Sequence, residues 1–277
     1  MKTPLRIEDP SLAELVGRVV AYGGLYDGPD PYGSFERVAA FTELVARFDA
    51  AVVTSLLAHE SPVLRGYIAR HLLRDRRPAL ELFEPLLLDD REFDTLTGCL
   101  ADRITLGELL CNEIGLLSSR YGPLRREPEP TRSEAMLCFL ERAARDSSLS
   151  VDVRGCALEN LGSSEATRAL PLIRAGIESE HPAIVCGALA GMRLLPLDEL
   201  EAALPRLLEH PHPSVRFDAL YAADAREVGD LETLLERVAA NDPDRGVKSA
   251  ASQLRSTLDA RRRRKRKRAA FLSSLPD

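Results

Sequence analysis

A short pattern of hydrophobic and small residues recurs along the chain. An aliphatic residue is followed, at the fourth and fifth positions, by residues that are mostly small or apolar. Residues at i, i+3 and i+4 lie on one face of an α-helix, so the pattern predicts helices that admit a close neighbour. The six segments that share it are LRGYIA from Leu64, LTGCLA from Leu96, VRGCAL from Val153, IVCGAL from Ile184, VRFDAL from Val215 and VKSAAS from Val247.

The pattern returns at a nearly constant interval. Successive segments begin 32, 57, 31, 31 and 32 residues apart, and the long interval is either nearly two periods or one period with an insertion. A second helical pattern, with an internal proline, lies between segments at 79–88, 169–177 and 203–210. One unit is therefore helix, turn, helix. The sequence predicts an all-α fold in which such units stack into a solenoid and bury their apolar stripes.

Two segments of the repeat region are similar to a known family. HPSVRFDALYA (212–222) and ATRALPLIRAG (166–176) resemble HEAT repeats, specifically the short HEAT-like repeats of the bilin-lyase type. The resemblance covers about residues 61–260 and implies a right-handed α-α superhelix with a concave helix face. It implies a binding role, such as that of an immunity protein or an assembly factor. A HEAT-like lyase subunit stays open as an alternative, although no residue marks a bilin site.

The rest of the chain divides around this region. Residues 1–60 are expected to form a helical cap, with helices over 11–22 and 34–58 joined by a loop at 23–34 that is rich in Gly, Pro and Tyr. An insertion loop is expected at 118–131, and the basic tail covers 261–277. Because insertions in repeat proteins often carry binding residues, the candidate contacts in this loop are Tyr121, Arg125 and Arg126.

A basic residue follows the first aliphatic position in four of the repeat segments. These residues are Arg65, Arg154, Arg216 and Lys248. One interpretation is an ion-pair ladder between repeats, with Asp152, Asp218 and Asp244 as the expected acceptors. The other is a basic stripe that faces a partner, which makes the four residues candidate partner-binding residues.

Charge is distributed unevenly. The chain has a formal net charge of −6, and residues 261–277 carry +7, so residues 1–260 carry −13. The cations of the tail are consecutive: Arg261, Arg262, Arg263, Arg264, Lys265, Arg266, Lys267 and Arg268. Contact with the acidic body, a polyanion such as nucleic acid, and a targeting signal are all open interpretations. Repulsion between like charges at i and i+4 predicts that a helix entering this run frays.

Composition and motifs narrow the function classes. The hydrophobic share of 45% is typical of a folded protein, and the absence of a long apolar run or signal-peptide core predicts a cytoplasmic protein that does not span a membrane. Arg greatly outnumbers Lys, which indicates a GC-rich bacterial genome. The five cysteines lack metal-ligand spacing, and no GxSxG, GxGxxG, P-loop or HExxH motif occurs, so no metal, cofactor or catalytic residue is predicted.

The functional prediction is accordingly a non-catalytic scaffold or regulator that binds a protein along the concave face of the solenoid. The acidic body favours a basic partner, because complementary fields orient encounter. Nucleic-acid association through the basic tail is the alternative. The oligomeric state stays open.

Overall fold

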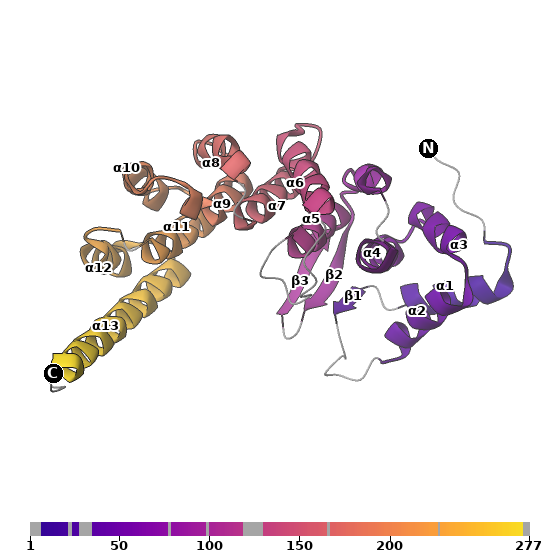
Figure 1. The fold of residues 1–277 in the computed structure, drawn as a ribbon, viewed down its shortest axis with the longest axis horizontal. Helices are drawn as coiled ribbons and strands as arrows, with labels where there is room; N and C mark the ends of the chain where they lie inside the picture. The colour runs from indigo at the N-terminus through magenta and orange to yellow at the C-terminus, as the bar shows by residue number, and fades with distance from the viewer. Residues whose placement is uncertain are drawn as a thin grey trace. The chain divides into compact units, whose positions relative to one another are not determined.

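The computed structural model describes residues 7–21, 24–27, 35–76, 79–97, 100–118, 130–164, 167–226 and 228–273. The chain forms two compact units, Met1–Ser164 and Glu165–Asp277 (Figure 1). Helix occupies 77% of the residues, which confirms the all-α prediction in its coarse form of a mostly helical protein. The boundary between the units falls within the region predicted to be one solenoid, 61–260.

The first unit begins with the helices predicted for the cap. Helix α1 (Pro10–Val20) starts at Asp9, whose Oδ1 accepts hydrogen bonds from the Ser11 and Leu12 amides at 2.8 and 3.1 Å. The single helix predicted over 34–58 is instead α2 (Phe35–Arg47), α3 (Ala50–Ser55) and the 3₁₀ turn η1 (Leu56–Ala58). Asp49 divides it, because its carboxylate accepts from the Val52 amide at 2.8 Å and so begins a new helix.

A small sheet in this unit corrects two predictions. Strands β1 (Gly24–Asp27), β2 (Glu92–Thr97) and β3 (Leu100–Thr105) lie in the order β1-β2-β3, with β1 parallel and β3 antiparallel to β2. The stretch 23–34 is therefore not loop throughout, and the described residues of LTGCLA, 96–97 and 100–101, lie in strands rather than in a helix. In β2, buried Phe93 and Thr95 alternate with exposed Glu92 and Asp94, so a two-residue period decides the structure.

The remaining helices of the first unit include α5, which follows the strands formed at LTGCLA. They are α4 (Pro62–His71), the π-helix η2 (Leu72–Arg76), the 3₁₀ helix η3 (Leu80–Leu86), α5 (Leu106–Ser118), α6 (Pro130–Arg145) and α7 (Val151–Ser163). Helix α5 packs between α4 and α7, while α6 packs on both α5 and α7. The predicted helix over 79–88 is the 3₁₀ helix η3, which contains Pro85.

Two glycines of the first unit permit close packing, one against strands and the other against a helix. A Cβ on Gly66 of α4 would lie 2.8 Å from Leu25 Cδ1 of β1 and 3.5 Å from Phe93 Cζ of β2. A Cβ on Gly107 of α5 would lie 2.6 Å from Val153 Cγ2 of α7. The small face of α4 therefore receives side chains of the sheet, and α5 receives a helix.

The second unit consists of three stacked helix pairs. The pairs are α8 (Leu170–Ile177) with α9 (Pro182–Ala190), α10 (Leu197–Leu208) with α11 (Pro213–Ala225), and α12 (Leu231–Asn241) with α13 (Arg245–Ser273). The short 3₁₀ helices η4 (Thr167–Ala169) and η5 (Met192–Leu194) lie between them. Helices α9, α11 and α13 pack in succession and form the inner row, and α8, α10 and α12 form the outer row (Figure 1).

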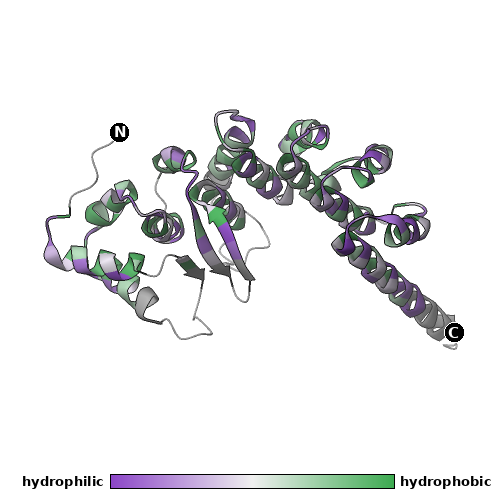
Figure 2. Ribbon diagram, turned by 180° about the vertical axis from the view of Figure 1, so that it is seen from behind, coloured by the Kyte–Doolittle hydropathy of each residue, from purple (hydrophilic) through white to green (hydrophobic). Residues whose placement is uncertain are grey.

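Most helices of both units carry both hydrophobic and hydrophilic residues (Figure 2). In the inner row of the second unit, Val185, Val215 and Val247 are buried at equivalent places in successive pairs. These positions are the first aliphatic residue of the pattern or its neighbour, so the pattern marks core positions correctly here. In the described part of the chain, no helix combines the length and apolar composition that a membrane span requires.

Candidate functional site

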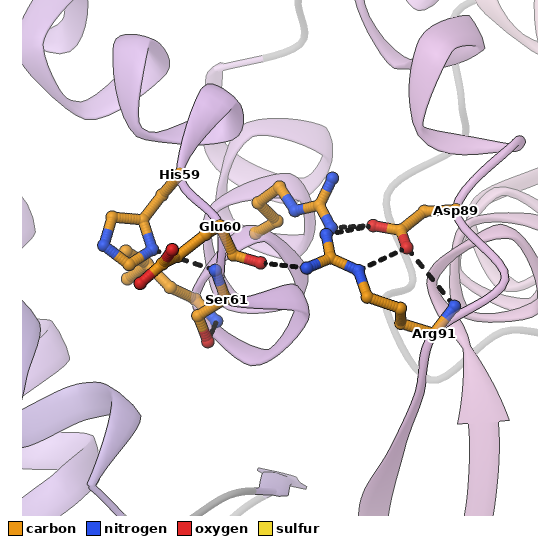
Figure 3. A network of polar contacts seen from close by, with 7 residues as sticks. His59, Glu60, Ser61, Asp89 and Arg91 are labelled. Atoms are coloured by element: carbon orange, nitrogen blue, oxygen red, sulfur yellow. Dashed lines mark hydrogen bonds and ion pairs between the residues drawn. The ribbon is translucent and has the colours of Figure 1, made fainter. Parts of the chain in front are cut away.

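Arg65 lies in a buried ion-pair network between two turns of the first unit. Its guanidinium forms an ion pair with the carboxylate of Asp89, which also accepts hydrogen bonds from Arg91 Nε and Nη2 at 2.9 and 3.0 Å. Arg91 Nη1 donates to the Glu60 carbonyl at 2.6 Å, which links the turn before α4 to the turn before β2 (Figure 3). Burial, together with the nearby charge of Arg91, lowers the pKa of Arg65 to about 10.

Arg216 occupies the corresponding place at the start of α11. Its Nε and Nη2 donate to the two carboxylate oxygens of Asp242 at 2.8 and 2.9 Å, and Nη1 donates to the carbonyls of His210 and Pro211. The hydrogen bonds from Arg216 lower the pKa of Asp242, and those to Asp242 raise the pKa of Arg216. Asp242 follows α12, so the pair joins successive helix pairs.

These two arginines fit the ladder interpretation, with different acceptors from those predicted. Arg65 and Arg216 are buried and each binds an aspartate of the following turn, so a partner has little access to either guanidinium. The expected acceptor Asp244 instead caps α13, because its Oδ1 accepts from the Val247 amide at 3.0 Å. The repeat alignment alone did not identify Asp89 and Asp242, because they do not occupy equivalent positions in it. Asp89 lies seven residues before the repeat segment at Leu96, whereas Asp242 lies five residues before the segment at Val247.

The other predicted partner contacts are less enclosed or lie outside the described residues. Arg154 and Lys248 are half-buried, and Arg154 Nε donates to the Ala144 carbonyl at 3.5 Å. Lys248 lies near Asp242 and contributes to its lowered pKa. Tyr121, Arg125 and Arg126 lie outside the described residues. A partner-binding role for these five residues stays a prediction.

A second buried charge cluster escaped the sequence analysis. Glu113 on α5 forms an ion pair with Arg70, whose Nε lies 2.6 Å from Oε1, and its Oε2 accepts a hydrogen bond from Arg74 Nε at 3.0 Å. Arg74 lies in the π-helix η2, which changes the helical periodicity just after α4. Two guanidinium groups on one buried carboxylate tie α4 and η2 to α5, which is a structural arrangement rather than a reactive one.

The basic run begins as part of α13. Arg261 Nη1 and Nη2 bind the buried carboxylate of Asp224 on α11 at 3.0 and 3.1 Å, and Arg262 forms an ion pair with Glu232 on α12. This pair raises the pKa of Arg262 and lowers that of Glu232. Arg263 and Arg264 are exposed, and the side chains of Lys265, Arg266, Lys267 and Arg268 lie outside the described residues. The helix continues to Ser273, so the expected fraying within the run is wrong.

An exposed aromatic pair on α11 is a further feature that was not predicted from the sequence. Phe217 and Tyr221 are 37% and 42% exposed, and their ring centroids lie 4.9 Å apart at an interplanar angle of 36°. Asp218 follows Phe217 in the sequence and is half-buried. Burial raises the pKa of Asp218, and a hydrogen bond with Cys186 of α9 acts in the opposite direction. The signal in the sequence was Phe217 and Tyr221 at i and i+4, opposite the buried Val215 and Ala219.

Among the described residues, no group of three or more His, Cys, Asp and Glu side chains lies close enough together to hold a metal ion. Cys111, Cys138, Cys156 and Cys186 are not in disulfides, and Cys99 lies outside the described residues. Comparisons with protein-family models, curated proteins and solved structures find no match to this chain.

Proposed function

We propose that this protein is a non-catalytic interaction module of short HEAT-like repeats that binds a basic protein partner through the inner helix row of residues 165–277. The succession of three helix pairs supports the HEAT-like interpretation. The right-handed superhelical arrangement and a cytoplasmic location in a bacterium belong to the same proposal. Arrays of this kind present extended surfaces for partners.

The observation that carries the proposal is the exposed pair Phe217–Tyr221. Aromatic residues make up only 5% of the chain, yet these two stack in solvent on the middle helix of the inner row. Aromatic side chains are enriched in the cores of interfaces, where they supply much of the binding energy. The pair is not required by the core, because Val215 and Ala219 on the other side of α11 already fill it.

The surroundings of the pair favour a cationic side chain from the partner. The faces of the two rings attract the cation of an arginine or lysine. The charge of −13 on residues 1–260 acts in the same direction over longer distances. A partner with an exposed arginine or lysine at the centre of its interface fits this surface.

The test compares the proteins captured from a lysate of the native host by three forms of the full chain. The double variant Phe217→Ala/Tyr221→Ala removes the pair, and Leu197→Ala removes an equally exposed apolar residue from outer helix α10 as a matched control. We expect one stoichiometric protein with the wild type and with Leu197→Ala, and its loss with the double variant. Recovery of the same protein with all three forms would show that the inner row is not the binding surface.

A further inference from the structure

The basic run lies on a long, continuous helix. Helix α13 spans Arg245–Ser273 and is 29 residues long, whereas its partner α12 has 11 residues. The first part of α13 packs on α11 and α12 through Val247, Ala250, Ala251 and Leu254, which are buried. The second part carries the cations and runs beyond α12 (Figure 1).

Two ion pairs fix the start of the basic run to the body. Arg261 binds Asp224 of α11 with both terminal nitrogens, and Arg262 binds Glu232 in the first turn of α12. Because these arginines are held by two different helices, they fix both the direction of α13 and its rotation about its axis. Self-contact therefore accounts for the first two of the eight cations.

The following cations have no such counter-charges in the described structure. Arg263 and Arg264 are exposed, and no described carboxylate forms an ion pair with either of them. The helix continues for 11 residues beyond Arg262, which corresponds to about 16 Å at 1.5 Å per residue. Arg268 lies about 9 Å further along the axis than Arg262, which is about one Debye length at physiological salt. The charge of Glu232, the partner of Arg262, therefore acts only weakly at the end of the run.

The distribution of these cations favours one kind of partner. Six consecutive residues, 263–268, turn through about 600° at 100° each, so the basic positions are distributed around the whole circumference of the helix. An interfacial membrane helix needs an apolar face, and these six positions contain none. A charge every ~1.5 Å along the axis is close to the phosphate charge every ~1.7 Å along a DNA duplex. A helix of this width also fits the major groove of B-DNA.

We propose that residues 263–268 of α13 form a basic helical arm that binds the phosphate backbone of a nucleic-acid duplex, while Arg261 and Arg262 anchor the arm to the body. The binding is electrostatic and is made mainly to phosphates, because the arm offers only cations. It is separate from the aromatic pair on α11 and does not depend on a protein partner.

The test measures binding of the full chain to fluorescent duplexes of DNA and of RNA with the same sequence, by anisotropy at several salt concentrations. Six phosphate contacts predict a slope of log K against log salt of about −5 for DNA, and about a 10³-fold loss of affinity between 50 and 200 mM salt. Binding to either duplex with such a slope supports the arm. The deep, narrow major groove of duplex RNA leads us to expect tighter binding to DNA.

Two variants with equal losses of positive charge separate the arm from general electrostatics. The arm variant carries R263Q, R264Q, K265Q, R266Q, K267Q and R268Q, which keep a residue suited to helices at each position. The control variant carries R103Q, R142Q, R145Q, R174Q, R206Q and R255Q, all of which replace exposed arginines of the body. We expect at least about a 100-fold loss of affinity at 50 mM salt for the arm variant and a much smaller loss for the control.

Three results would overturn the proposal. They are equal affinity of the wild type and the arm variant for both duplexes, an equal loss of affinity in the arm and control variants, and no duplex binding at low salt. Sedimentation with phosphatidylcholine–phosphatidylserine vesicles in the absence of duplex binding would instead assign the arm to membranes. Circular dichroism of the arm variant checks that its helix content is retained.

Discussion

At the scale of single residues, the buried pair Arg216–Asp242 illustrates why a basic row need not be a binding surface. The sequence places a cation at the same position in four repeats, but burial and hydrogen bonding turn Arg216 inward. All three of its guanidinium nitrogens have acceptors, which is the condition under which a buried cation is tolerated. Arg65 is likewise buried and paired with an aspartate, Asp89. Its hydrogen bonding is less complete than that of Arg216, since its Nε has no hydrogen-bond acceptor among the described atoms.

Replacement of Asp242 by Asn should therefore be costly. Asp242→Asn leaves the buried Arg216 without its counter-charge, and we expect a loss of about 3–5 kcal/mol in the free energy of unfolding. Glu199→Gln breaks the exposed pair Arg174–Glu199 in the same unit and should have little effect. Urea unfolding followed by circular dichroism measures both. Equal effects of the two variants would contradict the importance of burial at this site.

The same variant predicts a pH dependence. Arg216 holds the pKa of Asp242 below its ordinary value of 3.8, so Asp242 favours folding when it is ionised. The stability difference between wild type and Asp242→Asn should be constant above about pH 5 and should shrink as the pH falls below about 4. Melting temperatures of the two proteins across this range test the prediction. A difference that grows on acidification would have the wrong sign.

Gly115 is a residue whose importance depends on its neighbour. A Cβ there would lie 2.7 Å from the Cβ of Asn160 on α7, whose side-chain amide donates to Asn112 at 2.9 Å. We expect Gly115→Ala to lower the free energy of unfolding by about 1–3 kcal/mol despite its better helix propensity. Gly17→Ala is the control, since nothing lies within 4 Å of a Cβ there, and it should stabilise by about 0.4–1 kcal/mol. Stabilisation by both substitutions would show that α5 and α7 can move apart freely.

At the scale of secondary-structure elements, α13 combines two roles in one helix. Its first half completes the third helix pair, and its second half carries the basic run, in which Arg263 and Arg264 are exposed and form no ion pair with a described carboxylate. The prediction of fraying considered only repulsion within the run, at ~0.2–0.5 kcal/mol per pair. It did not include the attraction of Asp224 and Glu232, which stabilise the helix at Arg261 and Arg262, where the repulsion begins. The described ion pairs of the run end at Arg262.

Two truncations distinguish the anchoring residues from the rest of the arm. Removal of residues 265–277 keeps both anchoring ion pairs, so we expect the stability of the body to be unchanged. Removal of residues 261–277 leaves the buried carboxylate of Asp224 without Arg261. We expect a loss of about 1 kcal/mol, because Arg261 is itself half-exposed and water can partly replace it. Chemical denaturation of both proteins gives the comparison, and equal stabilities would show that the anchor is not energetically significant.

At the scale of the whole molecule, each of the two compact units has its own buried core. Phe83, Leu110 and Ile114 are fully buried in the first unit, and Ile173, Leu200 and Leu235 are fully buried in the second. We expect residues 165–277, expressed alone, to unfold cooperatively with the helix content found in the full chain. Circular dichroism and thermal unfolding test this. A fragment without a cooperative transition would show that the second unit depends on the first.

The sequence by itself determined the helix pairs of the second unit. The pattern at Ile184, Val215 and Val247 lies on helices of the inner row, because one apolar stripe per helix is a local property with a helical period. It also located the charge asymmetry, which depends on composition alone. The same pattern failed at Leu96, where an alternation of buried and exposed residues in β2 competes with it over only a few positions.

Only the tertiary structure decided which of these residues are available to a partner. It paired Arg65 and Arg216 with Asp89 and Asp242, paired Arg261 and Arg262 with acids of α11 and α12, and left Phe217 and Tyr221 in solvent. The physical reason is that an ion pair or an exposed ring depends on residues 20 to 40 positions away, brought close by helix packing. A one-dimensional pattern specifies the face of a helix, and the fold specifies what that face meets.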